Sequence, residues 1–242
     1  EDLNDGLLEK KDIKIIFKEI ISACRAKEKI ISIAFLGPLG TYSQQAVLKQ
    51  FGSSVKETPC MSIDEVFRTV EVGNVNFGLV PVENSTEGTV NRTLDLLLES
   101  SLMILGEVAL PIKHHLMSKN TNISTIKSIC GHAQAIAQCQ LWLNNHYPQI
   151  NRYELSSNGE AARVASEDVS VAAIAGELAA SRYSLKVIHK NIQDDPQNRT
   201  RFVIVGNLIT SPSGFDQTSL VLSVDNQPGA MHDLLSPLAK LS

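Results

Sequence analysis

Hydrophobic residues recur at helical spacing near the start of the chain. Six of them fall at positions i, i+3, i+4, i+7, i+8 and i+11, which is one face of an α-helix. They are Ile13, Ile16, Phe17, Ile20, Ile21 and Cys24. The pattern predicts an amphipathic helix over residues 12–28, with an apolar face that needs a partner and no obvious chemistry of its own.

From Ile30 to about Asn207, short apolar runs alternate with helical stretches. IISIAFLG, NFGLVPV, IKSICGH, RYELSS and VAAIA each precede a segment with helical spacing. Short apolar runs indicate strands, and strands that alternate with helices predict parallel sheets covered by helices on both faces. The fold class predicted for this region is therefore α/β.

The pattern changes again after the loop TSPSGFDQ. Leu220, Leu222 and Val224 alternate as in a strand, Pro228 and Gly229 predict a turn, and the leucines from Leu234 onward predict a helix. A segment this short cannot form a stable core alone. We interpret residues 217–242 as the first strand and helix of a truncated domain.

Composition excludes several classes of protein. The 242 residues are 43% hydrophobic and carry a net charge of −4, so nothing suggests nucleic-acid binding. The polar N-terminus and short apolar runs predict neither a signal peptide nor a membrane span, and we expect a cytoplasmic protein.

The cysteines and glycines indicate no metal or cofactor site. Cys130, His132 and Cys139 match no zinc spacing. Glycine-rich dinucleotide and phosphate loops are also missing, and we expect no metal and no cofactor.

Four turns and one strand carry the candidate chemistry. The turns are GPLGTYS (37–43), ENSTEG (83–88), GHAQA (131–135) and SSNGEA (156–161). Each is predicted to place backbone N–H groups and a helix N-terminus at the edge of a sheet. Ser43, Ser85 or Thr86, and Ser157 with Glu160, could merely cap helices. Their number, together with Arg201 at the start of a strand, favours a site for a small polyanion.

These motifs, in this order, resemble those of the prephenate dehydratase family. GPLGTYS, PVENSTEGTV, GHAQAIAQC, SSNGEAA and NRTRFVIVGN carry the resemblance over about residues 32–206. The chain departs from the family pattern at Leu39, where an acidic residue is usual, at Tyr42, where phenylalanine is usual, and at Arg199, where tyrosine is common. Residues 1–29 resemble the last helix of a chorismate mutase domain, and residues 217–242 resemble the opening of a regulatory ACT domain.

The resemblance implies a fold and a reaction. The expected dehydratase domain, residues 30–207, has two α/β subdomains with a cleft between them, as in periplasmic binding proteins. Subdomain 1 would comprise about 30–108 plus 190–207, and subdomain 2 about 109–189. The implied activity is that of a lyase in phenylalanine biosynthesis: prephenate loses its ring hydroxyl as water and its ring carboxylate as CO2, which leaves phenylpyruvate.

The resemblance also implies site residues. Thr200 would hydrogen-bond to the leaving oxygen, with water or Glu83 as the proton source, and Arg201 would pair with a substrate carboxylate or else join the subdomains. The remaining substrate-binding residues would be Thr41, Ser43, Asn84, Ser85, Thr86, Gly88, Gln134, Ala135, Ser157, Asn158 and Phe202, the last as packing at the cleft wall.

Partners and alternatives follow from the same resemblance. Pro228, Gly229 and Ala230 match the effector loop for L-phenylalanine, but the second effector motif is not present, so feedback inhibition by L-phenylalanine stays an open question. Chorismate mutase activity is not expected. We expect a homodimer or homotetramer held together by residues 12–28 or 218–242, because both expose unpartnered elements. Two alternatives stay open: arogenate dehydratase, and a non-catalytic solute-binding module of the same fold.

Overall fold

The helix predicted near the start of the chain is present. In the computed structural model, which describes residues 6–240, α1 spans Lys10–Glu28. Its polar face docks on the loop after α2 (Tyr42–Phe51): the Ser22 hydroxyl accepts a hydrogen bond from the Ser54 N–H at 3.2 Å, and the Ser53 hydroxyl donates to Glu19 at 2.6 Å. The apolar face stays open, with Phe17 59% exposed.

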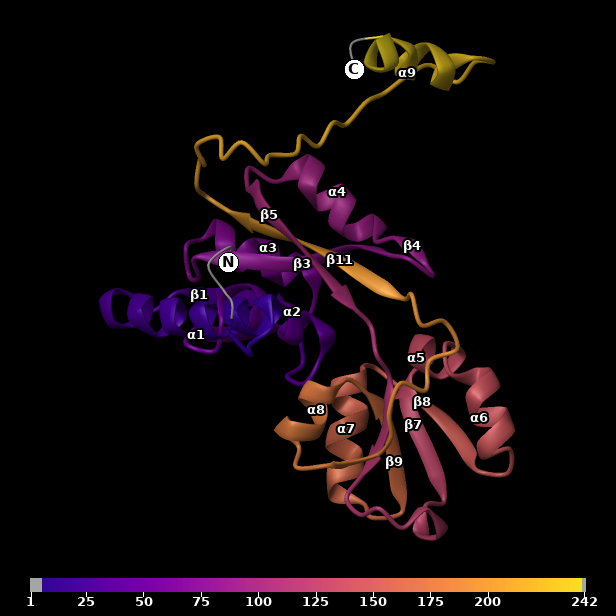
Figure 1. Ribbon diagram of the computed structural model, residues 1–242. Helices are drawn as coiled ribbons and strands as arrows, with labels where there is room; N and C mark the ends of the chain where they lie inside the picture. The colour runs from indigo at the N-terminus through magenta and orange to yellow at the C-terminus, as the bar shows by residue number, and fades with distance from the viewer. Residues whose placement is uncertain (1–5, 241–242) are drawn as a thin grey trace. The chain divides into compact units, whose positions relative to one another are not determined.

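A first α/β lobe is built on a sheet with strand order β2-β1-β3-β11-β5 (Figure 1). The strands are β1 (Ser32–Leu36), β2 (Lys56–Cys60), β3 (Phe77–Asn84), β5 (Met103–Pro111) and β11 (Arg199–Gly206), and the two-residue β4 (Gly88–Thr89) pairs with β3. β1 runs parallel to β2 and β3, but β11 is antiparallel to both β3 and β5.

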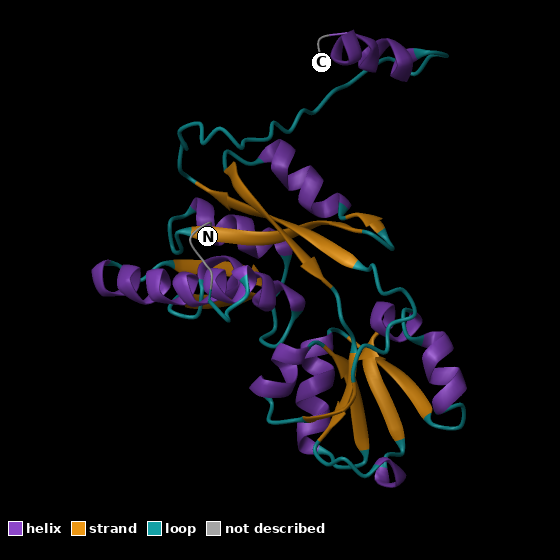
Figure 2. Ribbon diagram, viewed as in Figure 1, coloured by secondary structure: helices purple, strands orange, loops and turns teal. Residues whose placement is uncertain are grey.

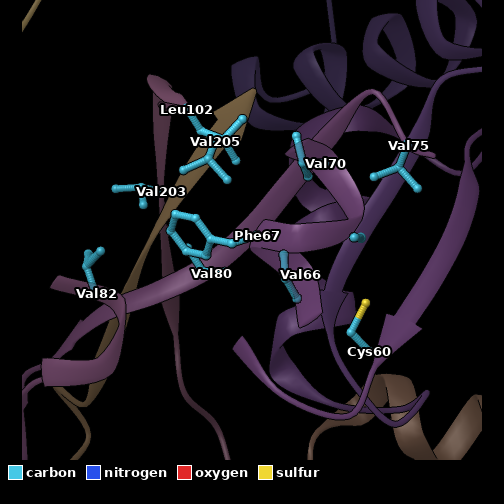
Figure 3. Close-up of a cluster of buried hydrophobic side chains, with 11 residues drawn as sticks. Cys60, Val66, Phe67, Val70, Val75, Val80, Val82, Leu102, Val203 and Val205 are labelled. Carbon is cyan, nitrogen blue, oxygen red and sulfur yellow. The ribbon is translucent and has the colours of Figure 1, made fainter. Parts of the chain in front are cut away.

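Two apolar layers cover the two faces of this sheet. Helices α3 (Ile63–Glu71) and α4 (Asn91–Glu99) pack on one face, where Val203 and Val205 of β11 join Phe67 and Val80 (Figure 3). Helix α2 packs on the other face, where Phe202 and Ile204 join Phe35 and Leu79. Successive residues of β11 therefore point to opposite faces, as the pleat of a strand requires.

A second lobe has the strand order β10-β6-β9-β7-β8. Its strands are β6 (His115–Ser118), β7 (Ser128–His132), β8 (Asn151–Leu155), β9 (Val171–Ala175) and β10 (Lys186–His189). Helices α7 (Asn158–Glu167) and α8 (Glu177–Arg182) pack on one face, and α5 (Ala133–Ala137) and α6 (Gln140–His146) pack on the other (Figure 2). A short 3₁₀ turn, η1, covers Ile123–Thr125. Alanines throughout β9 and along α7 leave room for this close packing.

The α/β class and the division into two lobes are confirmed, but the prediction of parallel sheets is only partly right, because each sheet combines parallel pairs with antiparallel ones. Strand β11 in the first lobe, and β6 in the second, run antiparallel to their neighbours. Both strands lie next to the segments that cross between the lobes. A strand that enters its sheet from the other lobe need not follow the strand-helix-strand order that makes neighbours parallel.

Two segments connect the lobes, and each contains a buried polar side chain. The first lies between β5 and β6 and includes His114, which is 2% exposed; the second lies between β10 and β11 and includes Asn198, also 2% exposed. Buried polar groups require hydrogen-bond partners. The partners of these two residues come from both lobes.

Residues 210–242 form a separate unit, in which α9 spans Ala230–Lys240. The predicted helix is present, whereas the strand predicted at Leu220–Val224 is not formed. A strand is stabilised by hydrogen bonds to a neighbour, and no described residue pairs with this stretch. A hollow of about 340 Å³ lies beside the turn that leads into α9.

The described residues include no helix long and apolar enough to cross a membrane. Cys60, Cys130 and Cys139 are buried free thiols, and Cys24 is exposed. Burial raises the pKa of the Cys130 thiol to about 11, which suits a packing role rather than a reactive one.

Candidate functional site

Asn84 and Thr200 lie opposite each other where the end of β3 meets the start of β11. The Asn84 side-chain oxygen accepts hydrogen bonds from the backbone N–H groups of Thr86 (3.0 Å) and Glu87 (3.3 Å). This asparagine-centred turn reverses the chain into β4. The ENSTEG stretch therefore does not begin a helix, and neither Ser85 nor Thr86 is a helix cap.

The backbone contacts fix which way the Asn84 amide faces. Because its oxygen is bound to two N–H groups, its nitrogen must face Thr200 and Asn198. It donates to the Thr200 hydroxyl oxygen at 2.8 Å and to the Asn198 side-chain oxygen at 3.2 Å. Within residues 6–240 the Thr200 hydroxyl donates to no acceptor, so its own proton is available for a ligand.

Asn198 and Gln138 complete this group, and sequence reasoning missed both. Asn198 donates to the Gln138 side-chain oxygen at 2.8 Å. The Ser85 hydroxyl contacts Asn198 at 3.4 Å and accepts from the Arg199 N–H at 3.0 Å. In the described part of the chain, the Gln138 side-chain nitrogen is buried without a hydrogen-bond partner. We refer to Asn84, Ser85, Gln138, Asn198 and Thr200 as the Thr200 network.

Glu83 and Arg201 lie apart from this network. Arg201 binds Glu83 at 2.7 Å and forms a two-pronged pair with Glu107 at 2.9 Å, and the three side chains are 35–44% exposed. The Arg201 hydrogen bond lowers the pKa of Glu107. Since Thr200 and Phe202 share one face of β11, Arg201 lies on the other face. Phe202 itself is buried in the core.

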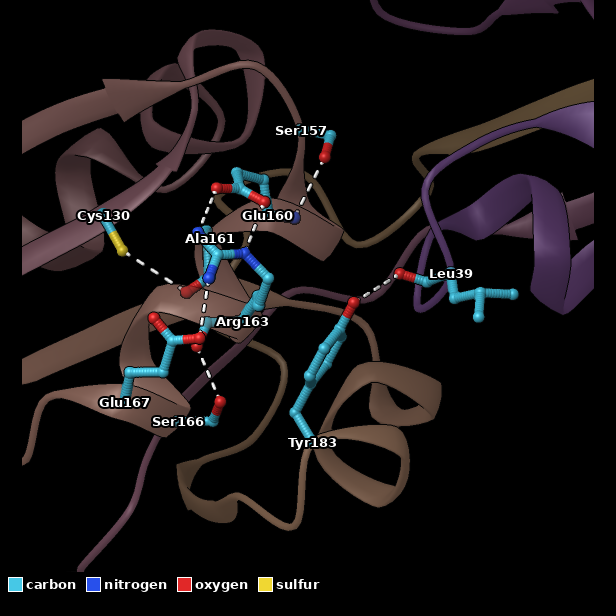
Figure 4. A network of polar contacts seen from close by, with 9 residues as sticks. All are labelled: Leu39, Cys130, Ser157, Glu160, Ala161, Arg163, Ser166, Glu167 and Tyr183. Atoms are coloured by element: carbon cyan, nitrogen blue, oxygen red, sulfur yellow. Dashed lines mark hydrogen bonds and ion pairs between the residues drawn. The ribbon is translucent and has the colours of Figure 1, made fainter. Parts of the chain in front are cut away.

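The first glycine turn lies against the second lobe. Thr41, not Ser43, caps α2, and its hydroxyl accepts from the Gln44 N–H at 3.4 Å. Ser43 is buried. The Tyr183 hydroxyl of the second lobe donates to the Leu39 carbonyl at 3.2 Å (Figure 4). The N-terminus of α2 therefore lies where the lobes meet.

The other helix starts among the candidates are those of α5 and α7. Ser157 caps α7 as predicted, accepting from the Glu160 N–H at 3.0 Å, but the Glu160 carboxylate binds Arg163 instead of closing a capping box (Figure 4). The Asn158 side chain accepts from the His132 N–H at 2.9 Å. In α5, Ala135 is a core residue and Gln134 is partly exposed.

The candidates thus form two groups. Asn84, Ser85 and Thr200 are joined by hydrogen bonds, with Thr86 in the adjoining turn and Gly88 at its end with φ of 85°. The second group comprises the turns at the starts of α2 and α7, which pack against each other at Leu39 and Gly159 and whose first N–H groups have no partner within the helix. Pro228, Gly229 and Ala230 belong to the separate unit, at the turn before α9.

Comparisons with known proteins identify the family of this chain. The model of the family described as prephenate dehydratase matches residues 33–209. A bifunctional chorismate mutase/prephenate dehydratase of Pseudomonas aeruginosa is 50% identical over 97% of this chain, which spans 65% of that relative's length. A prephenate dehydratase of Bacillus subtilis is 34% identical over 85% of the chain and 78% of the relative. The solved structure of the prephenate dehydratase of Arthrobacter aurescens, in complex with L-Phe, matches this chain with a TM-score of 0.76 at 31% identity. The match covers 87% of this chain and 72% of the Arthrobacter chain. On this evidence the chain belongs to the prephenate dehydratase family.

Proposed function

We propose that this chain converts prephenate to phenylpyruvate. The ring C–O bond breaks, the ring carboxylate leaves as CO2, and its bonding electron pair completes the aromatic ring. The departing hydroxide must gain one proton to leave as water. Because the product is aromatic, the main tasks are to hold the dianion and to assist the departure of the hydroxyl.

The free proton of Thr200 is the single observation that carries this proposal. Asn84 occupies a lone pair of the Thr200 oxygen, so the hydroxyl is oriented to donate a hydrogen bond to the leaving oxygen. A threonine hydroxyl is too weak an acid to lose its proton outright, and water is the proposed proton source. The contacts of Glu83 run to Arg201 on the opposite face, which does not favour Glu83 in this role.

Backbone N–H groups are the proposed binding sites for the carboxylates of prephenate. The first turns of α2 and α7 offer unpaired N–H groups and the positive ends of helix dipoles. The unpartnered Gln138 side-chain nitrogen is a further donor that a substrate oxygen would satisfy. Asn84, Ser85 and Thr86 would orient the ring between these binding sites, since none of them can act as an acid or base.

Incubation with prephenate, followed by direct detection of phenylpyruvate, tests the proposal. A rate above the spontaneous decay of prephenate is expected, and no rate above background with either prephenate or arogenate would leave only the solute-binding alternative. Arogenate, tested in parallel, decides between the keto and amino substrates: a higher kcat/KM with arogenate would replace prephenate in the proposal.

We also propose that the turn at Pro228–Ala230 is not by itself sufficient to bind L-phenylalanine. Residues 210–229 form no strand, so the turn has no sheet beneath it. Titration calorimetry with L-phenylalanine should show no saturable binding to this chain, and a stoichiometric isotherm would contradict the proposal.

A further inference from the structure

His114 joins the Thr200 network to the first helix of the dehydratase fold, although it lies in neither. It is buried in the segment that crosses from β5 to β6. One ring nitrogen, Nε2, is 2.9 Å from the Gln138 side-chain oxygen, and the other, Nδ1, is 2.8 Å from the Tyr42 hydroxyl. Tyr42 is the first residue of α2, so this contact links both lobes through one side chain.

The backbone determines which of these atoms carry protons. The Asn84 oxygen is held by two N–H groups, so the Asn84 nitrogen donates to the Asn198 oxygen. The Asn198 nitrogen must then donate to the Gln138 oxygen. Gln138 therefore presents an acceptor to His114, and His114 must carry its proton on Nε2.

Tyr42 completes the assignment. With the proton on Nε2, a neutral imidazole has its lone pair on Nδ1, which accepts the Tyr42 hydroxyl proton. Burial lowers the pKa of His114, which favours this neutral form. The backbone carbonyl of Lys113 lies 2.9 Å from the same hydroxyl. If His114 gains a proton, the hydroxyl can rotate to Lys113 and accept from Nδ1, and the bond from Nε2 to Gln138 is retained.

We propose that His114 is a positioning residue for the dehydratase site. Its Nε2–H holds the Gln138 amide, and through Asn198 and Asn84 this keeps the Thr200 proton directed at the substrate. The inference rests on the proposed function, and it assigns to His114 no contact with the reacting atoms.

Kinetics of two substitutions test this role. In His114→Leu the donor is lost, and kcat should fall roughly 10-fold or more while KM changes less than about 3-fold. In His114→Gln an amide nitrogen can replace Nε2, and kcat should recover to within about 3-fold of the parent value. The matched control is His115→Gln: His115 is also buried, but its Nδ1 accepts from the Asn191 N–H, away from the network. Its kcat should not change.

A folded His114→Leu protein with an unchanged kcat would overturn the proposal, as would a His114→Gln protein that is equally impaired. If the role of His114 were purely structural, both variants would have a lower unfolding temperature, and neither would show a fall in kcat at a nearly unchanged KM.

Nitrogen-15 NMR of the imidazole gives a readout that does not depend on activity. The His114 Nε2 signal should lie in the range of a protonated nitrogen and the Nδ1 signal in the range of an unprotonated one. The opposite tautomer would overturn this inference, whatever the activity. The expected tautomer without phenylpyruvate formation would instead refute the proposed function and leave the hydrogen-bond chain intact.

Discussion

Thr200 and Arg201 are adjacent in sequence but point to opposite faces of β11. The Thr200 hydroxyl accepts a hydrogen bond from the Asn84 amide near the junction of the lobes, whereas Arg201 lies on the opposite face of the sheet and binds the carboxylates of Glu83 and Glu107. Two polar residues at the start of one strand thus serve different purposes. The first belongs to the Thr200 network, for which we propose a role at the substrate, and the second joins β11 to its neighbours β3 and β5.

Removal of the Thr200 hydroxyl should slow the reaction without weakening substrate binding. In Thr200→Ala, kcat should fall roughly 10²-fold or more with little change in KM, because the hydrogen bond strengthens as the leaving oxygen gains charge. Steady-state rates of phenylpyruvate formation measure both quantities. Thr200→Ser keeps a hydroxyl and is the control. An unchanged kcat in Thr200→Ala would remove Thr200 from the mechanism.

Substitution of Arg201 should affect stability more than catalysis. Arg201→Met should lower the free energy of unfolding by about 0.5–1 kcal/mol, since these ion pairs are partly exposed to solvent, and should leave KM unchanged. Urea unfolding and a KM measurement separate the two effects. A KM at least tenfold higher with stability preserved would instead return Arg201 to the role of a substrate ligand.

Acidification should cost this protein stability through His114. Its pKa in the folded state is lowered from 6.5 by burial. The unfolded chain therefore binds a proton at a pH where the folded chain does not. The contribution of His114 is complete above pH 6.5 and is lost as the pH falls below it, by at most about 1.4 kcal/mol per pH unit.

Urea unfolding at several pH values checks this expectation. The difference in unfolding free energy between the parent and His114→Gln should shrink as the pH falls from 7.5 to 5.5. The parent protein, measured at the same pH values, is the reference. If the unfolding free energy of His114→Gln depends on pH in the same way as that of the parent, His114 is not the group that titrates.

A methyl group at position 159 should disturb the contact between the lobes. A Cβ on Gly159 would lie 2.5 Å from the Leu39 carbonyl oxygen, whereas one on Gly106 would meet its nearest atom, in Ile204, at an ordinary 3.5 Å. Neither glycine has a positive φ. Gly159→Ala should therefore destabilise the fold by roughly 1–3 kcal/mol and Gly106→Ala by clearly less. Thermal unfolding compares them, and equal effects would show that the Leu39 contact is unimportant.

The exposed face of α1 should mediate self-association. Phe17 and Ile20 are 59% and 51% exposed on a helix that docks through its polar side. Light scattering should report a homodimer for the parent and a lower mass for the double substitution Phe17→Ser with Ile20→Ser, while the exposed Lys27→Ser control keeps the parent mass. A monomeric parent, or a double variant of unchanged mass, would exclude α1 as the interface.

Local patterns predicted much of the fold but not the pairing of its strands. The apolar runs at β1, β3, β7 and β9 identified buried strands, because each contains mostly residues that pack on both sides. Strand β2, with the sequence KETPC, was missed because only its last residue is buried. The antiparallel insertion of β11 between β3 and β5 depends on contacts between distant segments, which no local period encodes.

The sequence motifs predicted only some of the residues of the candidate site. Thr200 and Asn84 were identified, and the structure joins them by a hydrogen bond. Gln138 and Asn198 lie within the same quoted stretches but were overlooked, since an amide at the end of a short helix or before a strand resembles an ordinary polar residue. Their roles depend on burial and on partners far away in sequence.

The place of β11 between β3 and β5 also sets an order of events during synthesis. Strand β5 has β11 as its pairing partner in the finished sheet, but the whole second lobe is translated between them. The second sheet is contiguous in sequence and can close as soon as β10 has emerged, while β5 must wait with both edges unpaired. A nascent chain stalled before Arg199 would thus contain one completed lobe and one incomplete sheet. The unpaired edges of β5 in that sheet are of the kind that chaperones or other chains bind.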